Sequence, residues 1–554
     1  MLRLFTCLCC TAILCGAAYC QSDDTPRAFE AADVHASPHR ANGYVSGGLM
    51  RGGRYQLRYA SMVDLIAAAY GVDAEKVLGG PSWLEMDHYE VIARTPPRTT
   101  AETVKPMLQA LLAERFHLAA HSDSRAVPAY VLTAGKHPAL KPADGSGETG
   151  CQGKVEGGGR GQEPSTTVPS FVVACHNTTM AAFVESLRDS PAQWLYLNNT
   201  TVVDQTGLEG AWDFSFKYSL RGMRAAGASD ITTVFDAVDK QLGLKLEPGK
   251  APMPVVVVDR VDRTPTPNAP DIAERLHAAP APTEFEVADV KPTDADFKGM
   301  RFQIQPGGRV NLQGMTLKFL IEQAWNLSDD MLVGAPKWMD TDRFDIVAKA
   351  PASAQVTGSG SAQPEIDFDT VLAMVRALVV ERFKLVTHTE QQPVAAYTLM
   401  AAKPRMKPAD PASRTRFKEG PATLESKDPR NSNPALSRLV TCQNMTMAQF
   451  AEELQGIAPG YIHSPVLDAT GLEGGWDFTL SFSPVGMMRG GGRAGRGGDD
   501  PPPPTDNVLA ASDPGTGMTL FEAMEKEIGL KLVLQKRPVS VLVIDSVERK
   551  PLDN

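Results

Sequence analysis

Apolar positions along the chain follow two periods, which predict short strands alternating with amphipathic helices. Residues 343–350 alternate apolar and polar side chains as a half-buried strand does, and two other segments place apolar residues at helical spacing. The two predicted helix faces comprise Val371, Met374, Val375, Leu378 and Val379, and Val104, Met107, Leu108, Leu111 and Leu112. Segregated strands and helices that include hairpins predict a fold of the α+β class.

The C-terminal pattern predicts a helix followed by a hairpin. Residues 520–528 form the expected helix, Gly529 is its C-cap, and a turn at 536–538 separates two strands. This unit looks like the small βαββ modules found before secretin channels and in the N-terminal extensions of outer-membrane receptors. The β-branched runs at 253–261 and 539–547 are expected to be exposed strands that pair with a strand of a partner.

Several phrases occur twice and in the same order, which identifies the chain as a duplication. One of them reads TGLEGAWDF in the first half and TGLEGGWDF in the second. The offset between the copies is 255 residues at Trp83 and Trp338, and 267 residues at His121 and His388. The second copy therefore holds an insertion between these positions, and its loop-like composition predicts a surface loop.

The duplication sets the predicted domain boundaries. We expect a first α+β domain at 26–264, a Pro-rich spacer at 265–283 and a second domain at 284–550. A second insertion, rich in Gly and Pro, predicts a flexible loop at 485–505 within the second domain.

Composition fits a globular protein of several domains and excludes wholesale disorder, because 43% of the 554 residues are hydrophobic and 22% are charged. The net charge of −10 gives no general attraction to nucleic acid, so no nucleic-acid partner is expected.

The N-terminus has the shape of a secretory signal peptide, predicted at 1–20. One Arg precedes a run of about 16 apolar residues, and the cut is expected after Ala18 or Cys20. Lipid attachment at Cys20 is the alternative, which the large Tyr19 disfavours. No other segment approaches 18 uninterrupted apolar residues, so we expect an exported protein, periplasmic or extracellular, without a membrane span.

Five of the eight cysteines lie in the predicted signal peptide. In an oxidising compartment, Cys151 and Cys175 are the expected disulfide pair. Cys442 is then left without a mate, and is either buried and inert or available to a partner thiol.

The recurring phrases together resemble an uncharacterised family of secreted soil-bacterial proteins, known as a domain of unknown function. The resemblance covers residues 28–264 and 284–550, with one domain in each copy. It implies an exported α+β domain that occurs alone or attached to membrane-bound regulatory peptidases. It brings no established activity, so it assigns no catalytic residue.

The repeated TGLEG phrase carries paired carboxylates, which can act in acid–base catalysis or bind calcium. The carboxylates are Asp204, Glu209 and Asp213 in the first copy, and Asp468, Glu473 and Asp477 in the second. The favoured interpretation is a Gly-rich turn that leads into a strand, whose Trp and Phe residues anchor the core.

Two further motifs have a functional and a structural interpretation. His117 and His121 have the spacing of a helical metal pair, but the first has a lysine as its counterpart in the second copy. His121 and His388 are therefore expected to make structural hydrogen bonds. Trp83 and Trp338 follow Pro residues, where an aromatic side chain lines a sugar- or peptide-binding groove or plugs the core.

We predict a non-enzymatic binding or interaction protein of the cell envelope or exterior, with a protein or small-molecule ligand and no metal or cofactor. The alternatives are a secreted hydrolase that uses the carboxylates near the TGLEG turns, and a sensor domain of an envelope signalling system. The candidate residues for a binding surface are Trp83, Trp338, His121, His388, Glu209 and Glu473.

Overall fold

The computed structural model describes most of the chain between residues 28 and 552. The ranges outside the description are 38–42, 44, 52, 157–168, 221–230, 277–282, 298, 306, 328–330, 355–365, 367, 432, 434–435 and 486–516. The predicted signal peptide with Cys20 also lies outside the described residues, as does nearly all of the predicted loop at 485–505.

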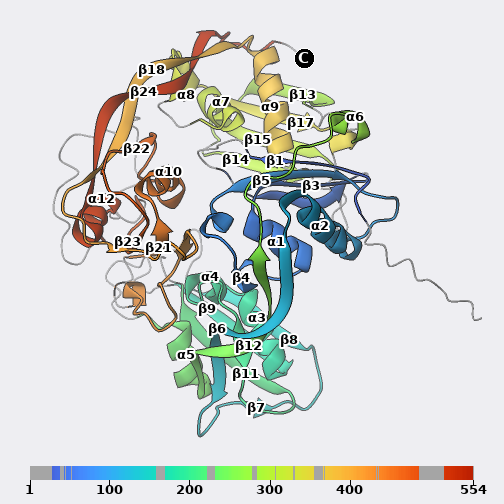
Figure 1. The fold of residues 1–554 in the computed structure, drawn as a ribbon, viewed down its shortest axis with the longest axis vertical. Coiled ribbons are helices and arrows are strands. Elements are labelled where there is room, and N and C mark those ends of the chain that lie inside the picture. The colour runs from blue at the N-terminus through green and yellow to red at the C-terminus, as the bar shows by residue number, and fades with distance from the viewer. Residues whose placement is uncertain are drawn as a thin grey trace, which may run out of the picture.

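The first copy folds into two lobes, drawn in blue and in cyan to green in Figure 1. In the first lobe, an antiparallel sheet in the order β1-β5-β3-β2 packs with two helices around one core. Its elements are β1 (Ala31–Ala36), β2 (Ser46–Arg51), β3 (Arg54–Ser61), α1 (Met62–Tyr70), the 3₁₀ turns η1 (Ala74–Lys76) and η2 (Ser82–Glu85), β5 (His88–Arg94) and α2 (Ala101–Phe116).

The second lobe has a separate core beneath a sheet in the order β7-β11-β9-β8. Its elements are β7 (Lys141–Pro142), β8 (Gly150–Glu156), β9 (Ser170–Thr178), α3 (Met180–Arg188), α4 (Ala192–Leu195), β11 (Trp212–Ser219) and α5 (Val234–Leu242).

A long antiparallel ribbon joins the two lobes. It consists of β6 (Ala119–Ala134) and β12 (Leu244–Arg260), which pair along their whole length. The short strands β4 (Val77–Gly79) and β10 (Val202–Asp204) extend the ribbon at opposite ends and in parallel. Because β12 contributes side chains to the core of the first lobe at one end and to the core of the second lobe at the other, the ribbon makes one body of the two lobes.

The second copy repeats this architecture, drawn in yellow and in orange to red in Figure 1. Its first lobe has the sheet order β13-β17-β15-β14, its second lobe has β19-β23-β21-β20, and its ribbon pairs β18 with β24. The first-lobe elements are β13 (Val287–Pro292), β14 (Arg301–Gln305), β15 (Arg309–Thr316), α7 (Leu317–Trp325), α8 (Trp338–Thr341), β17 (Arg343–Lys349), η4 (Ala352–Ala354) and α9 (Phe368–Arg382).

The remaining elements complete the second copy. The ribbon elements are β16 (Leu332–Val333), β18 (Val386–Ala401), β22 (Val466–Asp468) and β24 (Leu530–Ser546). The second-lobe elements are β19 (Lys407–Pro408), β20 (Arg416–Glu419), η5 (Pro429–Asn431), β21 (Arg438–Met445), α10 (Met447–Ile457), β23 (Trp476–Phe482), α12 (Leu520–Ala523) and the π turn η6 (Met524–Ile528). The α+β class and the duplication are both confirmed.

Local sequence signals explain where the helices begin and end. Thr316 is the N-cap of α7, and its side chain accepts a hydrogen bond from the Phe319 N–H. Gly529 ends the last helix in the left-handed conformation, with φ of 72°, as expected of a C-cap glycine. The apolar stripes predicted for α2 and α9 are buried in both copies.

The predicted terminal hairpins are wrong. Strand β24 runs unbroken through 536–538, where a turn was expected, and pairs there with Pro393, Val394 and Ala395 of β18. Pro538 faces Pro393 across the ladder. In an antiparallel ladder every second facing pair exchanges no backbone hydrogen bond, and two prolines are tolerated at such a pair. A proline at this position therefore does not force a turn.

The predicted exposed edge strands are also wrong. The run Val255–Val258 in β12 is buried, because β6 pairs with it on one edge and β4 covers part of the other. In the second copy, β24 lies between β18 and β16 in the same way. The β-branched composition of both runs therefore reflects burial on the two faces of a ribbon.

The first half of the predicted spacer packs on the first copy. The buried Arg115 donates to the Thr266 carbonyl and, at 2.7 Å, to Asn268 Oδ1. Asn268 in turn donates to Asp33 in β1, and α6 (Ile272–Arg275) follows against the same strand. Residues 264–276 are therefore part of the first lobe and do not form a free linker.

Candidate functional site

The recurring histidines make the same structural hydrogen bond in both copies. His121 Nδ1 lies 2.8 Å from Asp259 across the first ribbon, and His388 Nδ1 lies 2.8 Å from Asp545 across the second. The bond to Asp545, with a smaller contribution from Glu390, raises the pKa of His388 above its ordinary value. Both imidazoles are about half exposed and clamp the ribbon end.

Two further ion pairs repeat at the same ends of the ribbons. Arg263 makes a bidentate pair with Asp87, and its counterpart Arg549 makes one with Asp342. These contacts tie the residues that follow each ribbon to the first lobe. The repeated charged residues near the ribbon are thus explained by architecture.

In each copy, the aspartate of the TGLEG phrase stabilises a β-bulge in the neighbouring strand. Asp213 accepts a hydrogen bond from the backbone N–H of Asn177 at 2.8 Å, and Asp477 does the same for Asn444. Both asparagines have left-handed backbones, with φ of 46° and 47°, at points where the strand register shifts. Glu209 and Glu473, in contrast, are exposed on the turns.

The two tryptophans lie at equivalent positions beside their first-lobe cores. Trp83 in η2 meets Tyr89 edge to face, with ring centroids 6.4 Å apart, and packs against the first-lobe core. Trp338 begins α8 and packs against the corresponding core of the second copy. Both tryptophans are thus partly buried side chains that cover the edge of a hydrophobic core.

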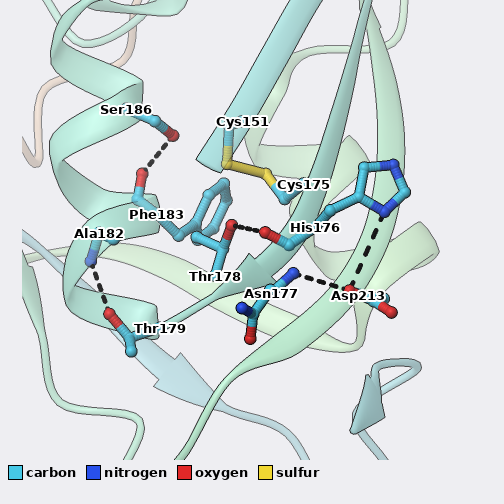
Figure 2. The surroundings of a disulfide bond; sticks show 10 residues. All are labelled: Cys151, Cys175, His176, Asn177, Thr178, Thr179, Ala182, Phe183, Ser186 and Asp213. Carbon is cyan, nitrogen blue, oxygen red and sulfur yellow. Dashed lines mark hydrogen bonds and ion pairs between the residues drawn. A yellow bond between two sulfur atoms is a disulfide. The ribbon is translucent and has the colours of Figure 1, made fainter. Parts of the chain in front are cut away.

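Cys151 and Cys175 form the disulfide that the sequence predicts, between the facing strands β8 and β9. Figure 2 shows that the His176 ring points toward Asp213 and away from the disulfide. In the second copy, Phe417 occupies the position opposite Cys442. Cys442 is free and buried, and burial raises the pKa of its thiol, so of the two alternatives the buried state holds.

The two copies dock through a loop of the second copy. Arg414 donates to the carbonyl oxygens of Val77 and Gly79 at 3.0 and 2.6 Å, and to Glu85 at 3.0 Å. The adjacent Thr415 N–H donates to the Ser82 carbonyl at 2.9 Å. These bonds satisfy the backbone of β4 and η2 in the first copy with groups from the second.

A second contact fixes the other end of this loop. Arg430 is almost fully buried, pairs with Asp428 at 2.9 Å and donates to Asn198 of the first copy at 2.9 Å. Gly420 lies so close to Asn198 that a Cβ on it would overlap the amide. The docking is therefore a packed, hydrogen-bonded interface.

Beside this interface lies a cleft of about 700 Å³, a volume typical of ligand sites. The first copy contributes Ala36, Ser37, Gly43, Tyr59, Glu85, Met86, Asp87, His88, Tyr89, Arg263, Thr264 and Pro265. The second contributes Arg416, Phe417, Gln449, Glu452, Glu453 and Gly456. None of the six predicted binding-surface residues lines the cleft.

Helix α10 forms one wall of the cleft with a regular stripe. Its lining residues, Gln449, Glu452, Glu453 and Gly456, have the i, i+3, i+4, i+7 spacing of one helix face. Among the described residues, neither Glu452 nor Glu453 makes an ion pair. Burial, and then the neighbouring Glu452 charge, raise the pKa of Glu453.

The opposite wall carries paired charges and aromatic rings. Asp87 is neutralised by Arg263, and Glu85 faces Arg414 and Arg416. Burial raises the pKa of Glu85 although these arginines oppose the shift. Burial lowers the pKa of His88, which keeps its imidazole neutral over a wider pH range.

Tyr59 lines the cleft in an unusual backbone conformation. Its φ is 51°, and its ring stacks on His88 with centroids 4.1 Å apart. The equivalent residue in the second copy is Gly314, with φ of 69°. Left-handed backbone is disfavoured for a bulky residue, so the first copy keeps a strained tyrosine where the second has the unstrained glycine.

Sequence reasoning missed this cleft because it examined what the two copies share. Some cleft residues differ between the copies, as Tyr59 differs from Gly314 and Glu453 from its counterpart Ser186, whereas others such as Asp87 recur. A search for chemically different residues at matched positions would have found part of the site.

Two kinds of feature are absent from the residues that the structure describes. No group of three or more His, Cys, Asp or Glu side chains in that part of the chain is arranged to hold a metal ion. No helix there is long and apolar enough to cross a bilayer.

Comparison with known proteins gives one family. Residues 63–261 and 318–547 match the family described as protein of unknown function (DUF3738), with one match on each copy. Neither the curated proteins nor the solved structures contain a match to the chain. Because the two matches together cover most of the sequence, the chain belongs to the DUF3738 family and carries its domain twice.

Proposed function

We propose that the chain is an exported binding protein and that its ligand occupies the cleft between the two copies. One observation carries the proposal: both copies build the cleft, and some of its residues, such as Tyr59 and Glu453, have chemically different counterparts in the other copy. The signal-like N-terminus supports export. Placing a site between two homologous bodies gives one ligand contacts from two rigid walls.

The chemistry of the walls favours a ligand with an amine or guanidinium group. The α10 wall adds two carboxylates without ion-pair partners in the described part of the chain, whereas the acids opposite are already paired with arginines. The Tyr59–His88 stack offers an aromatic surface close by, and aromatic faces attract organic cations. A planar or aromatic amine fits both walls.

The test compares ligands of similar shape and opposite charge. Isothermal titration with tyramine and agmatine is expected to detect binding, whereas 4-hydroxyphenylacetate, the anionic counterpart of tyramine, is expected not to bind. Binding should tighten as pH rises through the raised pKa of Glu453, because the carboxylate must be ionised to hold a cation.

Matched variants then place the ligand. Glu453→Gln should weaken amine binding about tenfold, the effect of losing one favourable charge contact. Glu185→Gln is the control, because Glu185 is the first-copy counterpart of Glu452 and lies outside the cleft. Equal binding by both variants, preference for the anion or no binding by any amine would overturn the assignment. Chemical turnover of the amine would make the protein an enzyme instead.

A further inference from the structure

The last turn of α10 lines the cleft and holds no basic residue. The matching helix of the first copy, α3, has Arg188 in its last turn. The carbonyl oxygens that end a helix carry partial negative charge, and a cation close to them is stabilising. The first copy therefore supplies this cation from its own sequence, and the second copy does not.

The acid beside this helix end has lost its partner as well. In α3, Glu185 lies 3.9 Å from Arg188, about one turn further along the helix. The counterpart of Glu185 is Glu452, and Gln455 stands where the first copy has the arginine. Glu453 adds a second carboxylate to the same wall. The second copy thus has two acids and no cation in the part of α10 that faces the cleft.

Gly456 leaves the backbone of α10 open to the cleft. Because glycine has no side chain, the atoms by which it lines the cleft belong to the backbone. A Cβ at this position would meet no atom within 4 Å, and the backbone φ is not positive, so neither packing nor conformation requires a glycine here. Glycine is also unfavourable within a helix. In the part of the chain that the structure describes, no group donates a hydrogen bond to the Gly456 carbonyl oxygen.

The other end of the α10 wall is less suited to a cation. Gln449 is engaged there as part of the helix cap, and its Oε1 accepts hydrogen bonds from the Thr446 N–H and hydroxyl, both at 3.0 Å. The first turn of a helix also carries partial positive charge, which repels a cation. The last turn, with Glu452, Glu453 and Gly456, is therefore the part of the wall that best accommodates a positive group.

We propose that the last turn of α10 holds the charged group of the ligand, and that this group is a cation with N–H donors, such as a primary ammonium. The inference rests on the proposed function and narrows it. The two carboxylates balance the charge, and the N–H groups donate to them and to the Gly456 carbonyl oxygen. The ligand thus supplies the cation that Arg188 provides in the first copy. A quaternary ammonium has no N–H, and its methyl groups would hold it away from the carbonyl.

Isothermal titration of the full chain with tyramine and with its N,N,N-trimethyl derivative tests the chemistry. Both probes carry one positive charge and the same ring, but only tyramine has N–H donors on its cation. We expect tyramine to bind at least about tenfold more tightly, because the trimethyl derivative loses the hydrogen bonds of a charged group.

Two pairs of variants test the position of the cation. Gln455→Arg gives α10 the cation that α3 has and should weaken tyramine binding about fivefold, whereas the uncharged Gln455→Met should not. Gly456→Leu fills the open space and should weaken binding at least about tenfold, because the ligand can no longer reach the backbone. Ala448→Leu, an exposed change on the same helix outside the cleft, is its control. Both leucine variants should keep the denaturation midpoint, since both positions are exposed.

The outcomes separate this inference from the proposed function. If no amine binds the unaltered chain, both fall. Equal affinity for tyramine and its trimethyl derivative would overturn the inference alone and would place the cation on the Tyr59–His88 stack. Tyramine binding that Gln455→Arg and Gly456→Leu leave unchanged would also overturn the inference while the cleft remains an amine site. If Gly456→Leu lowers the denaturation midpoint, the comparison of Gln455→Arg with Gln455→Met decides.

Discussion

Tyr59 combines a strained left-handed backbone with a place in the proposed amine-binding cleft. Substituting Gly relieves left-handed strain of about 1–2 kcal/mol but removes a ring stack of about 0.5–1.5 kcal/mol. We therefore expect Tyr59→Gly to change the free energy of unfolding by less than about 1 kcal/mol while weakening amine binding. Denaturant unfolding and isothermal titration measure the two quantities separately.

The reverse change at the matched position is the control for Tyr59. Gly314→Tyr introduces the left-handed strain, and its Cβ would overlap the Gly299 carbonyl and crowd the Phe297 ring. It should destabilise the protein by more than about 2 kcal/mol. Equal effects of the two substitutions on stability would contradict the interpretation that Tyr59 is retained for the cleft.

His388 predicts a pH-dependent contribution to stability. Its pKa is raised in the folded state by Asp545, so folding favours the protonated ring. The stabilisation is complete below the unfolded pKa of about 6.5 and is lost as pH rises through the folded pKa. Asp545→Asn should therefore destabilise the protein at about pH 5.5 and have no such effect at about pH 8, as measured by denaturant unfolding.

A matched ion pair separates this effect from general electrostatics. The Lys384–Glu548 ion pair lies nearby, with 2.9 Å between the amine and the carboxylate, and it contains no histidine, the side chain whose ordinary pKa lies between about pH 5 and 8. Glu548→Gln should therefore give the same stability difference at both pH values. A similar profile for the two variants would remove His388 as the cause.

At the scale of elements, the β-bulge explains why the same acid recurs as the second residue of strands β11 and β23. Asp477→Ala leaves the Asn444 N–H without its acceptor at the bulge, and should lower the free energy of unfolding by about 1–3 kcal/mol. Glu473→Gln, an exposed change on the turn that precedes the strand, should alter the free energy of unfolding by less than about 0.5 kcal/mol. Chemical denaturation of the two variants provides the comparison. The opposite order would return the glutamates to consideration as functional groups.

Element types followed from the sequence where local physics decides them. Thr316 caps its helix, the α9 stripe is buried, and Cys151 finds Cys175, because spacing and capping chemistry act over short distances. The hairpins failed because Pro538 is read as a turn signal, whereas its strand pairs over its whole length with β18, more than a hundred residues away. Pairing over such a separation overrode the local signal.

The arrangement of the two copies in the whole molecule could not be predicted from the sequence, for a related reason. Two copies were evident, but the cleft depends on Arg416 of one copy meeting Glu85 of the other, and these positions are not equivalent. Repeats indicate which residues build each body and not how two bodies dock. The proposed binding surface is formed by the docking of the two copies, for which hydrophobic periodicity gives no signal.

Arg414 is therefore the residue that we expect to control the shape of the whole chain. Arg414→Ala removes the donor to two carbonyl groups and leaves the partly buried Glu85 without its closest cation, which should weaken docking by about 2–3 kcal/mol. The radius of gyration from small-angle scattering should rise, and the amine site should be lost, because the cleft needs both copies. Separation should increase as pH rises, since undocking lets Glu85, whose pKa is raised by burial, ionise in water.

Arg405→Ala, which removes a bond within the second copy, is the matched control and should keep the compact shape. An unchanged radius together with intact amine binding in Arg414→Ala would show that the copies are held together by other contacts.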